Sequence, residues 1–163
     1  MSKPPETNVE NYKYEFTGKT SDLYGTTVWQ IRRIANGGPD TGLVGGWIAR
    51  EDNLSFNGHC WVFPHAKVGD NARVEGNAQI FGNALVYDDA TISDNSSVSD
   101  YARVYEDARV SGEAEVCGNA QVLGTAQVLD EARVSGDAVI CGATIVSGNT
   151  HIDTGIYEDE SED

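Results

Sequence analysis

The sequence is poor in basic residues. Its 163 residues include 11 Lys and Arg against 26 Asp and Glu, which gives a net charge of −15. This charge argues against nucleic acid and anionic membranes as direct partners and favours a basic partner. The chain also lacks any run near the ~20 apolar residues of a membrane span, and its first residues lack the apolar core of a signal peptide. We therefore predict a cytoplasmic protein with no membrane contact.

Cysteine and histidine are scarce as well, with three of each. They are Cys60, Cys117 and Cys141, and His59, His65 and His151. The odd number of cysteines, without metal-ligand spacing, indicates reduced thiols. The histidines do not cluster as a metal site requires, and none has a visible partner for general-base work. Without a phosphate loop, a nucleotide fingerprint or a nucleophile elbow, the sequence predicts no metal, no cofactor and no catalytic residue.

One pattern runs through most of the chain without interruption. From Val62 to Ile152 every sixth residue is Val or Ile, sixteen in all, and a small residue, most often Ala, stands two places before each. Turn pairs such as Gly76-Asn77 follow the aliphatic residue. A period of six with β-branched residues excludes a helix and predicts short strands. A single hexad is too short to bury its side chains, so we expect coils stacked at the strand spacing of about 4.8 Å.

The segment from Cys60 to Ile152 resembles the hexapeptide-repeat family. The resemblance implies an all-β fold, a left-handed parallel β-helix with three hexads in each coil and about five coils over residues 62–152. Acyltransferases of that family work as trimers, with a catalytic histidine and a loop that protrudes from one coil. No hexad between Val62 and Ile152 carries an insertion, so this loop is missing here.

The remaining segments do not follow the period. Residues 1–12 are polar and predicted to be disordered, and residues 153–163 form an acidic, solvated tail. Residues 13–61 form a small β cap, with strands in 12–16 and 26–34 and a turn at 36–42. A solenoid end exposes apolar core and strand edges, so a plug is needed. We expect it to consist of Trp29, Trp47, Leu54, Phe56 and Trp61.

The junction between the cap and the repeat carries a second motif. It consists of Gly45, Gly46, Trp47, Asn53, Leu54, Gly58, Cys60, Trp61 and Val62. The motif resembles the junction in YdcK-type acyltransferase-like proteins and in small phage or prophage hexapeptide-repeat proteins. The resemblance implies a shared cap and a phage or prophage protein in the cytoplasm of a bacterial host cell.

Two outward features of the coils are candidate interaction sites. Three hexads per coil place residues 18 apart on one face. One face, the Tyr87 face, consists of Leu85, Tyr87, Arg103, Tyr105, Gln121, Leu123 and Val139. The corner that follows, the acidic ridge, consists of Asp70, Asp88, Asp89, Glu106 and Asp107. A contiguous apolar stripe indicates an interface, so we expect a homo-oligomer, a dimer or trimer, that packs through the Tyr87 face. The ridge is either a row of screened turn residues or a surface for a basic protein, for example as a nucleic-acid mimic.

The leading functional hypothesis is a non-enzymatic, acidic interaction module that binds and inhibits a host defence factor. One alternative is an acyltransferase-like enzyme with its site between subunits. Another is a sponge that sequesters a nucleotide between subunits, with Arg103 or Arg109 holding phosphate.

Overall fold

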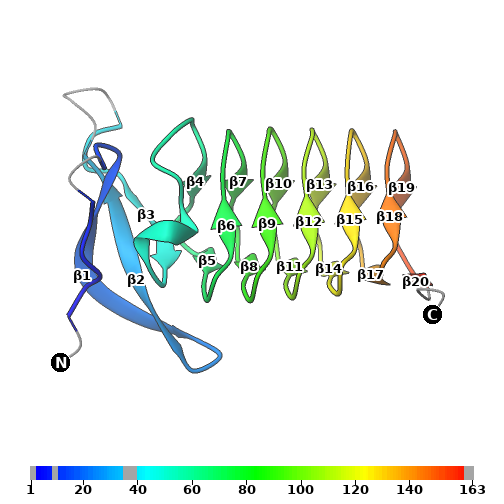
Figure 1. Cartoon of the computed structure of the whole chain (residues 1–163), viewed down its shortest axis with the longest axis horizontal. Coiled ribbons are helices and arrows are strands. Elements are labelled where there is room, and N and C mark those ends of the chain that lie inside the picture. Colours follow the sequence, from blue (N-terminus) through cyan, green and yellow to red (C-terminus); the bar gives the residue numbers. More distant parts are fainter. Residues whose placement is uncertain (1–2, 9–10, 35–39, 160–163) are drawn as a thin grey trace.

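The chain folds as a parallel β-solenoid of about six turns, with a β-hairpin at its N-terminal end (Figure 1). The computed structural model describes residues 3–8, 11–34 and 40–159. The predicted disordered N-terminus, the 36–42 turn and the acidic tail fall partly outside these ranges. The described residues contain strands and one 3₁₀ turn, η1 (Glu51–Asn53), and no α-helix. The all-β solenoid is therefore confirmed, while the left-handed sense of its coil stays a prediction.

Three sheets form the sides of the solenoid. Face A holds nine strands in the order β1 (Tyr14–Leu23), β2 (Thr26–Arg33), β3 (Val44–Ile48), β5 (Lys67–Val68), β8 (Leu85–Val86), β11 (Arg103–Val104), β14 (Gln121–Val122), β17 (Val139–Gly142) and β20 (Ile156–Asp159). Face B holds β6 (Arg73–Val74), β9 (Thr91–Ile92), β12 (Arg109–Val110), β15 (Gln127–Val128) and β18 (Ile145–Val146). Face C holds β4 (Trp61–Val62), β7 (Gln79–Ile80), β10 (Ser97–Val98), β13 (Glu115–Val116), β16 (Arg133–Val134) and β19 (His151–Ile152).

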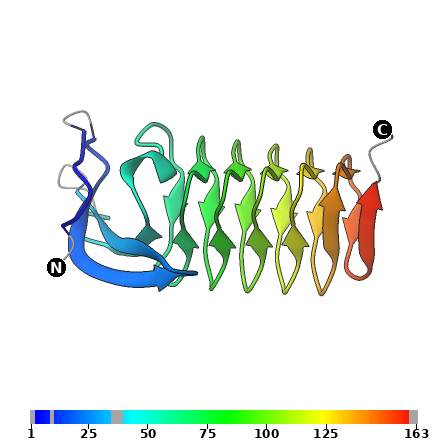
Figure 2. The same ribbon diagram turned by 60° about the horizontal axis from the view of Figure 1, so that its bottom comes forward.

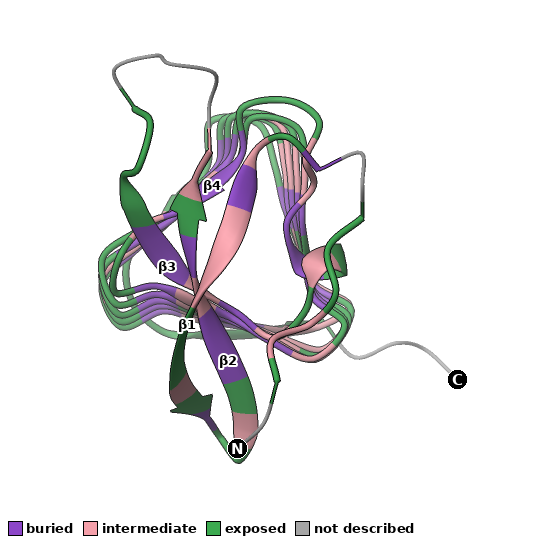
Figure 3. Cartoon of the chain, turned by 90° about the vertical axis from the view of Figure 1, so that its left-hand side faces the viewer, coloured by how far each residue is buried: buried purple, intermediate pink, exposed green. Residues whose placement is uncertain are grey.

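The core is the column of hexad aliphatics. The side chains from Val62 to Ile140 in this column are fully buried, and Val146 is 3% exposed. The twelve alanines two places before them are also fully buried, which leaves room for the larger side chains inside a narrow coil. Viewed along its long axis, the molecule shows superposed coils with exposed residues at the corners (Figure 3).

Main-chain hydrogen bonds hold each coil to the next. Around Val104, for example, the N–H groups of Arg103, Tyr105 and Asp107 donate to carbonyls of Ala120, Val122 and Gly124 in the following coil, at 3.0 Å each. The sequence separation between paired residues is constant from Trp61 to Ile152, as in Arg103 with Gln121 and Val134 with Ile152. Every coil in this stretch therefore has the same length, as the absence of insertions predicted.

Most corners have a left-handed backbone two residues after the aliphatic, and Pro64 and Thr154 are the exceptions. Some corners use Gly there, and six use an acidic residue with φ between 49° and 59°. These are Asp70, Asp88, Asp94, Asp100, Glu106 and Asp130. Each carboxylate accepts the N–H of the equivalent corner residue in the next coil, for example Asp94 Oδ2 from Gly112 N at 3.0 Å. The acidic corners thus satisfy main-chain donors of the next coil.

The solenoid continues beyond the sixteen hexads at both ends, with coils of different length. Ile48 and Leu54 are fully buried and pair with Val68 and Val74. This first coil is longer than the regular ones, since the loop between Leu54 and Val62 is longer than a regular hexad, whereas the hexad that contains η1 has the usual length. At the other end, β20 pairs with β17, and Tyr157 lies opposite Ile140 in a coil that is slightly shorter than the rest. Because these two coils differ in length from the others, their core residues do not continue the period of six in the sequence. Within the predicted acidic tail, residues 156–159 therefore form a strand, and they are exposed as predicted.

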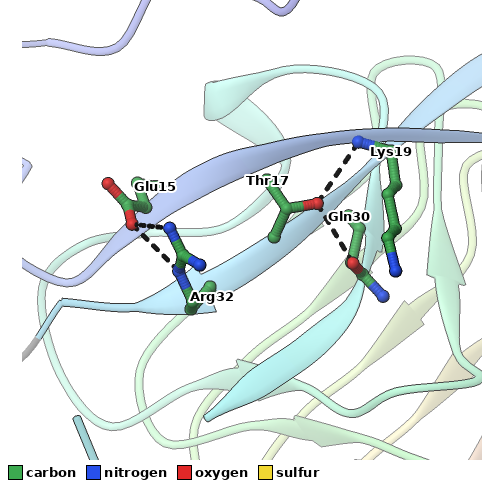
Figure 4. Close-up of polar contacts among 5 residues, drawn as sticks. All are labelled: Glu15, Thr17, Lys19, Gln30 and Arg32. Atoms are coloured by element: carbon green, nitrogen blue, oxygen red, sulfur yellow. Dashed lines mark hydrogen bonds and ion pairs between the residues drawn. The ribbon is translucent and has the colours of Figure 1, made fainter. Parts of the chain in front are cut away.

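A long hairpin, β1 and β2, continues face A at the N-terminal end. A bulge interrupts its register, because Phe16 pairs with Ile31 and Thr20 with Trp29, which leaves only Gln30 opposite three residues. The Thr17 hydroxyl donates to Gln30 Oε1 at 3.0 Å and accepts the Lys19 N–H at 3.3 Å (Figure 4). A bulge bends and twists a hairpin. The far half of this hairpin runs along the side of the first coils (Figure 2).

The plug at the N-terminal end differs from the predicted set. Leu54 and Trp61 belong to the core cluster as expected, but its other cap residues are Tyr14, Ile31, Ile48 and Cys60. Trp29 is buried outside this cluster. Trp47 and Phe56 are only half-buried, and the Trp47 indole donates to the Pro64 carbonyl. For Trp29, Trp47 and Phe56 the prediction was wrong, because the first coil places the aliphatic side chains of Ile48 and Leu54 over Val68 and Val74.

A substitution series at Asp94 tests the role of the acidic corners. Asp94→Ala should lower the free energy of unfolding by about 1–3 kcal/mol, because alanine loses the bond to Gly112 N–H and is strained at positive φ. Asp94→Asn should stay close to the wild type, since Asn tolerates this backbone and offers an amide oxygen. Asp94→Gly should lie between them. Urea denaturation measures all three, and equal stability of the Ala and Asn variants would contradict the assignment.

Candidate interaction surface

The strands of face A bring the residues of the Tyr87 face together as predicted. Leu85, Arg103, Gln121 and Val139 lie in register on β8, β11, β14 and β17. Tyr87 and Tyr105 stack with their ring centroids 5.0 Å apart and their planes within 3°. Arg103 is exposed, and the other six residues are half-buried.

The tip of the hairpin covers the first part of this face. The Tyr24 ring lies 5.2 Å from the Tyr87 ring. The guanidinium of Arg103, which lies on the next coil, is 5.9 Å from the same Tyr24 ring. Leu23 is only 4% exposed and packs at Gly69, where a side chain on the glycine would collide with it. Tyr87 is therefore in contact with the chain's own cap, which the sequence analysis did not foresee.

Polar contacts fix the hairpin tip at the side of the second coil. The Lys67 ammonium donates to the Ser21 hydroxyl at 2.8 Å and to the Asp22 carbonyl at 2.7 Å. The Thr26 hydroxyl donates to Asp70 Oδ1 at 3.1 Å. The tip is thus held by a cation and a carboxylate of the solenoid on either side of the aromatic contact.

A local signal for this hairpin was present in the sequence. Tyr24 and Gly25 connect β1 to β2 and both have positive φ, 48° and 89°. A two-residue loop with this backbone is the commonest hairpin connection, and glycine favours it. The dipeptide between two β-rich runs could have predicted the hairpin, but not where its tip packs.

Burial changes the chemistry of the stacked tyrosines. Desolvation raises the pKa of Tyr87 above its usual value of 10.0, and the neighbouring Tyr24 and Tyr105 add to the rise while Arg103 opposes it. Desolvation also raises the pKa of Tyr105, with a further contribution from Glu106. The phenols therefore stay neutral at physiological pH and act as apolar rings with one polar atom.

Beyond the hairpin tip, the face continues as a strip of half-buried side chains. This open strip consists of Tyr105, Gln121, Leu123 and Val139. The Tyr105 hydroxyl donates to Gln121 Oε1 at 3.1 Å, which fixes the ring where it stacks on Tyr87. The strip joins half-buried apolar side chains on three successive coils, as a contiguous interface patch would.

The acidic ridge has an internal role that the sequence analysis did not recognise. The carboxylates of Asp70, Asp88 and Glu106 each accept a main-chain N–H of the next coil, at 3.3, 3.1 and 2.6 Å. Asp89 accepts from the Asn71 amide at 3.1 Å, and Asp107 is exposed. These bonds keep the negative charges in place, so the corner is both a structural ladder and an acidic surface.

The three histidines do not converge on one site. All are exposed, and His151 Nε2 lies 2.9 Å from the Ser135 hydroxyl on face C. Within the described part of the chain, no group of three His, Cys, Asp or Glu side chains could hold a metal ion. The proposed phosphate-binding arginines lie on different faces, Arg103 on face A and Arg109 on face B. No helix in the described ranges has the length and apolar character to cross a bilayer.

One hollow of about 400 Å³ lies where the cap meets face C. Its walls are mainly apolar and include Leu43, Val44, Trp61 and Phe63, and the Arg33 guanidinium lies 4.4 Å from the Trp61 ring. An ion pair joins Arg33 to Asp40 at 3.5 Å. None of the histidines lines the hollow, and the carboxylate in its wall, Asp40, is the one paired with Arg33.

Comparison with known proteins agrees with the β-solenoid fold and with the resemblance of the sequence to YdcK-type proteins. Residues 78–94 match the family model described as the YdcK beta solenoid repeat. The match spans β7, β8 and β9, one strand on each face, and includes Leu85, Tyr87, Asp88 and Asp89. A search of curated proteins gave no significant match. The chain is thus a hexapeptide-repeat-like β-helix similar to the YdcK solenoid.

The raised pKa of Tyr87 predicts a loss of stability in alkali. A group whose folded pKa lies above its unfolded value stabilises fully below the unfolded pKa, here about 10, and loses this contribution as pH rises further. The melting temperature should therefore fall between pH 9 and pH 11. Tyr87→Phe keeps the stacked ring but cannot ionise, so its fall should be smaller. Tyr12→Phe, at a ring that is 72% exposed, serves as the control and should behave like the wild type.

Proposed function

We propose that this chain is a non-enzymatic interaction module that self-associates through the open strip of the Tyr87 face. The observation that carries the proposal is the half-buried row of Tyr105, Leu123 and Val139, which continues past the point where the hairpin ends. A flat parallel sheet with ordered side chains loses little entropy when a second surface packs on it. Because these side chains are already half-buried, burying the remainder contributes about half of the 1.5–3 kcal/mol that full burial of an exposed side chain gives.

The hairpin supports this proposal by showing how the face is recognised. Tyr24 stacks on Tyr87, and Arg103 from the next coil approaches the same ring. Tyr105 and Gln121 repeat this arrangement one coil further along, since they occupy the hexad positions of Tyr87 and Arg103. A partner could therefore place an apolar or aromatic side chain on Tyr105 in the same way that the hairpin places Tyr24 on Tyr87.

We further propose that the acidic ridge meets a basic protein surface. Asp88 and Glu106 each accept one main-chain N–H through a single oxygen, which leaves the other oxygen for a partner. The net charge of −15 adds a long-range attraction for basic proteins. In its most specific form, the proposal is a phage or prophage accessory protein that inhibits a host defence factor in the bacterial cytoplasm, supported by the resemblance of the cap motif.

Self-association is tested by charge insertion. Tyr105→Glu with Leu123→Glu should reduce the mass measured by light scattering to that of a monomer, because two charges cannot be desolvated in the interface. The β-rich circular dichroism spectrum should not change, since the core is untouched. The control is Ser93→Glu with Ser111→Glu, which occupies the same hexad position on consecutive coils of face B. If the wild type is already a monomer, or if the double variant remains an oligomer, self-association through the open strip is contradicted.

The basic partner is tested by capture from a bacterial lysate on the immobilised protein. We expect a basic protein that is retained at low salt and released at high salt, because exposed charges are screened. Asp89→Asn with Asp107→Asn should weaken its capture. Glu113→Gln with Glu131→Gln removes the same charge at the same hexad position of another corner and should have little effect. Equal loss in both variants would indicate a non-specific charge effect and contradict a role for the ridge.

A further inference from the structure

A lysine and a cysteine meet where the cap joins the first coil. The Lys13 Nζ atom lies 3.2 Å from Cys60 Sγ and donates to the Ser55 and Gly58 carbonyls at 3.0 and 3.4 Å. The three contacts match the three N–H groups of an ammonium. Lys13 immediately precedes β1, whereas Cys60 immediately precedes β4, so the contact joins segments that are far apart in the sequence.

The surroundings bring the amine toward a reactive state. Cys60 is fully buried in the small-residue column of the core, and Lys13 is half-buried beside it. Desolvation lowers the pKa of Lys13, against an opposing contribution from Cys60. A larger fraction of this amine is therefore neutral and nucleophilic than for an exposed lysine.

We propose that Lys13 and Cys60 form a reversible covalent S–N cross-link when the protein meets hydrogen peroxide. In the first step the Cys60 thiol attacks the peroxide, the O–O bond breaks, and a sulfenic acid and one water form. In the second step the Lys13 amine attacks this sulfur, and the S–OH bond breaks. The hydroxyl leaves with one amine proton as a second water, and a sulfenamide remains. The sulfur is oxidised, the peroxide is reduced, and the pair loses two hydrogen atoms.

The geometry makes this outcome specific to Cys60. The nearest nitrogen recorded at Cys117 Sγ is Arg133 Nη2 at 3.7 Å, and a guanidinium stays protonated and does not attack sulfur. Cys141 Sγ contacts the Tyr157 carbonyl at 3.6 Å, which is not a nucleophile for this step. Burial of Cys60 slows its reaction with peroxide at both stages, but in the second stage the Lys13 amine is already 3.2 Å from the sulfur, so its attack competes with over-oxidation.

The link would fasten the base of the hairpin to the solenoid. A cross-link between distant positions stabilises mainly by restricting the unfolded chain. The oxidised protein should therefore melt at a higher temperature than the reduced one. The hairpin, whose tip covers Tyr87, would be held more firmly in peroxide than in a reducing cytosol.

The experiment uses the full chain with Cys117→Ser and Cys141→Ser, so that only Cys60 can react. After treatment with hydrogen peroxide, proteolysis and mass spectrometry should find the Lys13 and Cys60 peptides joined, two hydrogen atoms lighter than their sum. Dithiothreitol should release them and reverse the rise in melting temperature. Lys13→Arg keeps the positive charge and hydrogen-bond donors, and in this variant Cys60 should instead advance to sulfinic acid.

The variant with Cys117→Ser and Cys141→Ser tests the cross-link on its own, even if Lys13→Arg does not fold. Recovery of Cys60 as a sulfinic acid beside an unmodified Lys13 would overturn the proposal. So would an unreacted Cys60 thiol under peroxide that oxidises Cys117 and Cys141 in the wild type. A melting temperature that rises without joined peptides would assign the effect to another modification and also reject the link.

Discussion

Every feature of this molecule depends on the stacking of coils of equal length through main-chain hydrogen bonds. Position by position, N–H groups of one coil donate to carbonyls of the next coil, as Tyr105 does to Val122. An inserted residue would move each following side chain to the opposite side of its strand. The aliphatic column, the outward faces and the corners all keep their places because this length does not vary from Trp61 to Ile152.

The corners show how charge and backbone geometry are combined. A left-handed residue is needed at most turns, and glycine meets this need without strain. An Asp or Glu at the same position loses less entropy on folding than glycine, and its carboxylate accepts a donor of the next coil. Much of the acidity of the solenoid thus follows from its construction. A function in binding basic surfaces would use charges that the fold already requires.

The hairpin links stability to recognition. Its bulge bends it back along face A, and its tip places Tyr24 on Tyr87 and beside Arg103. The cap therefore closes one end of the solenoid and also occupies the first part of the candidate interface. What remains for a partner is the open strip further along, next to a ladder of charged corners. The Lys13 and Cys60 contact lies at the base of the same hairpin, where a cross-link would act on the cap as a whole.

The sequence by itself determined the coil register, the buried column and the set of residues on each face, because a period of six is a local property of the chain. It also determined that the Tyr87 face would be continuous, since equivalent positions of successive coils must stack. Only the tertiary structure decided which part of that face is free, because Tyr24 reaches Tyr87 from a distant part of the chain through a bulge with no periodic signal. The structure alone also revealed the first and last coils, whose different lengths break the period, and the contact of Lys13 with Cys60. Contacts of this kind depend on how the cap packs, which no repeat in the sequence encodes.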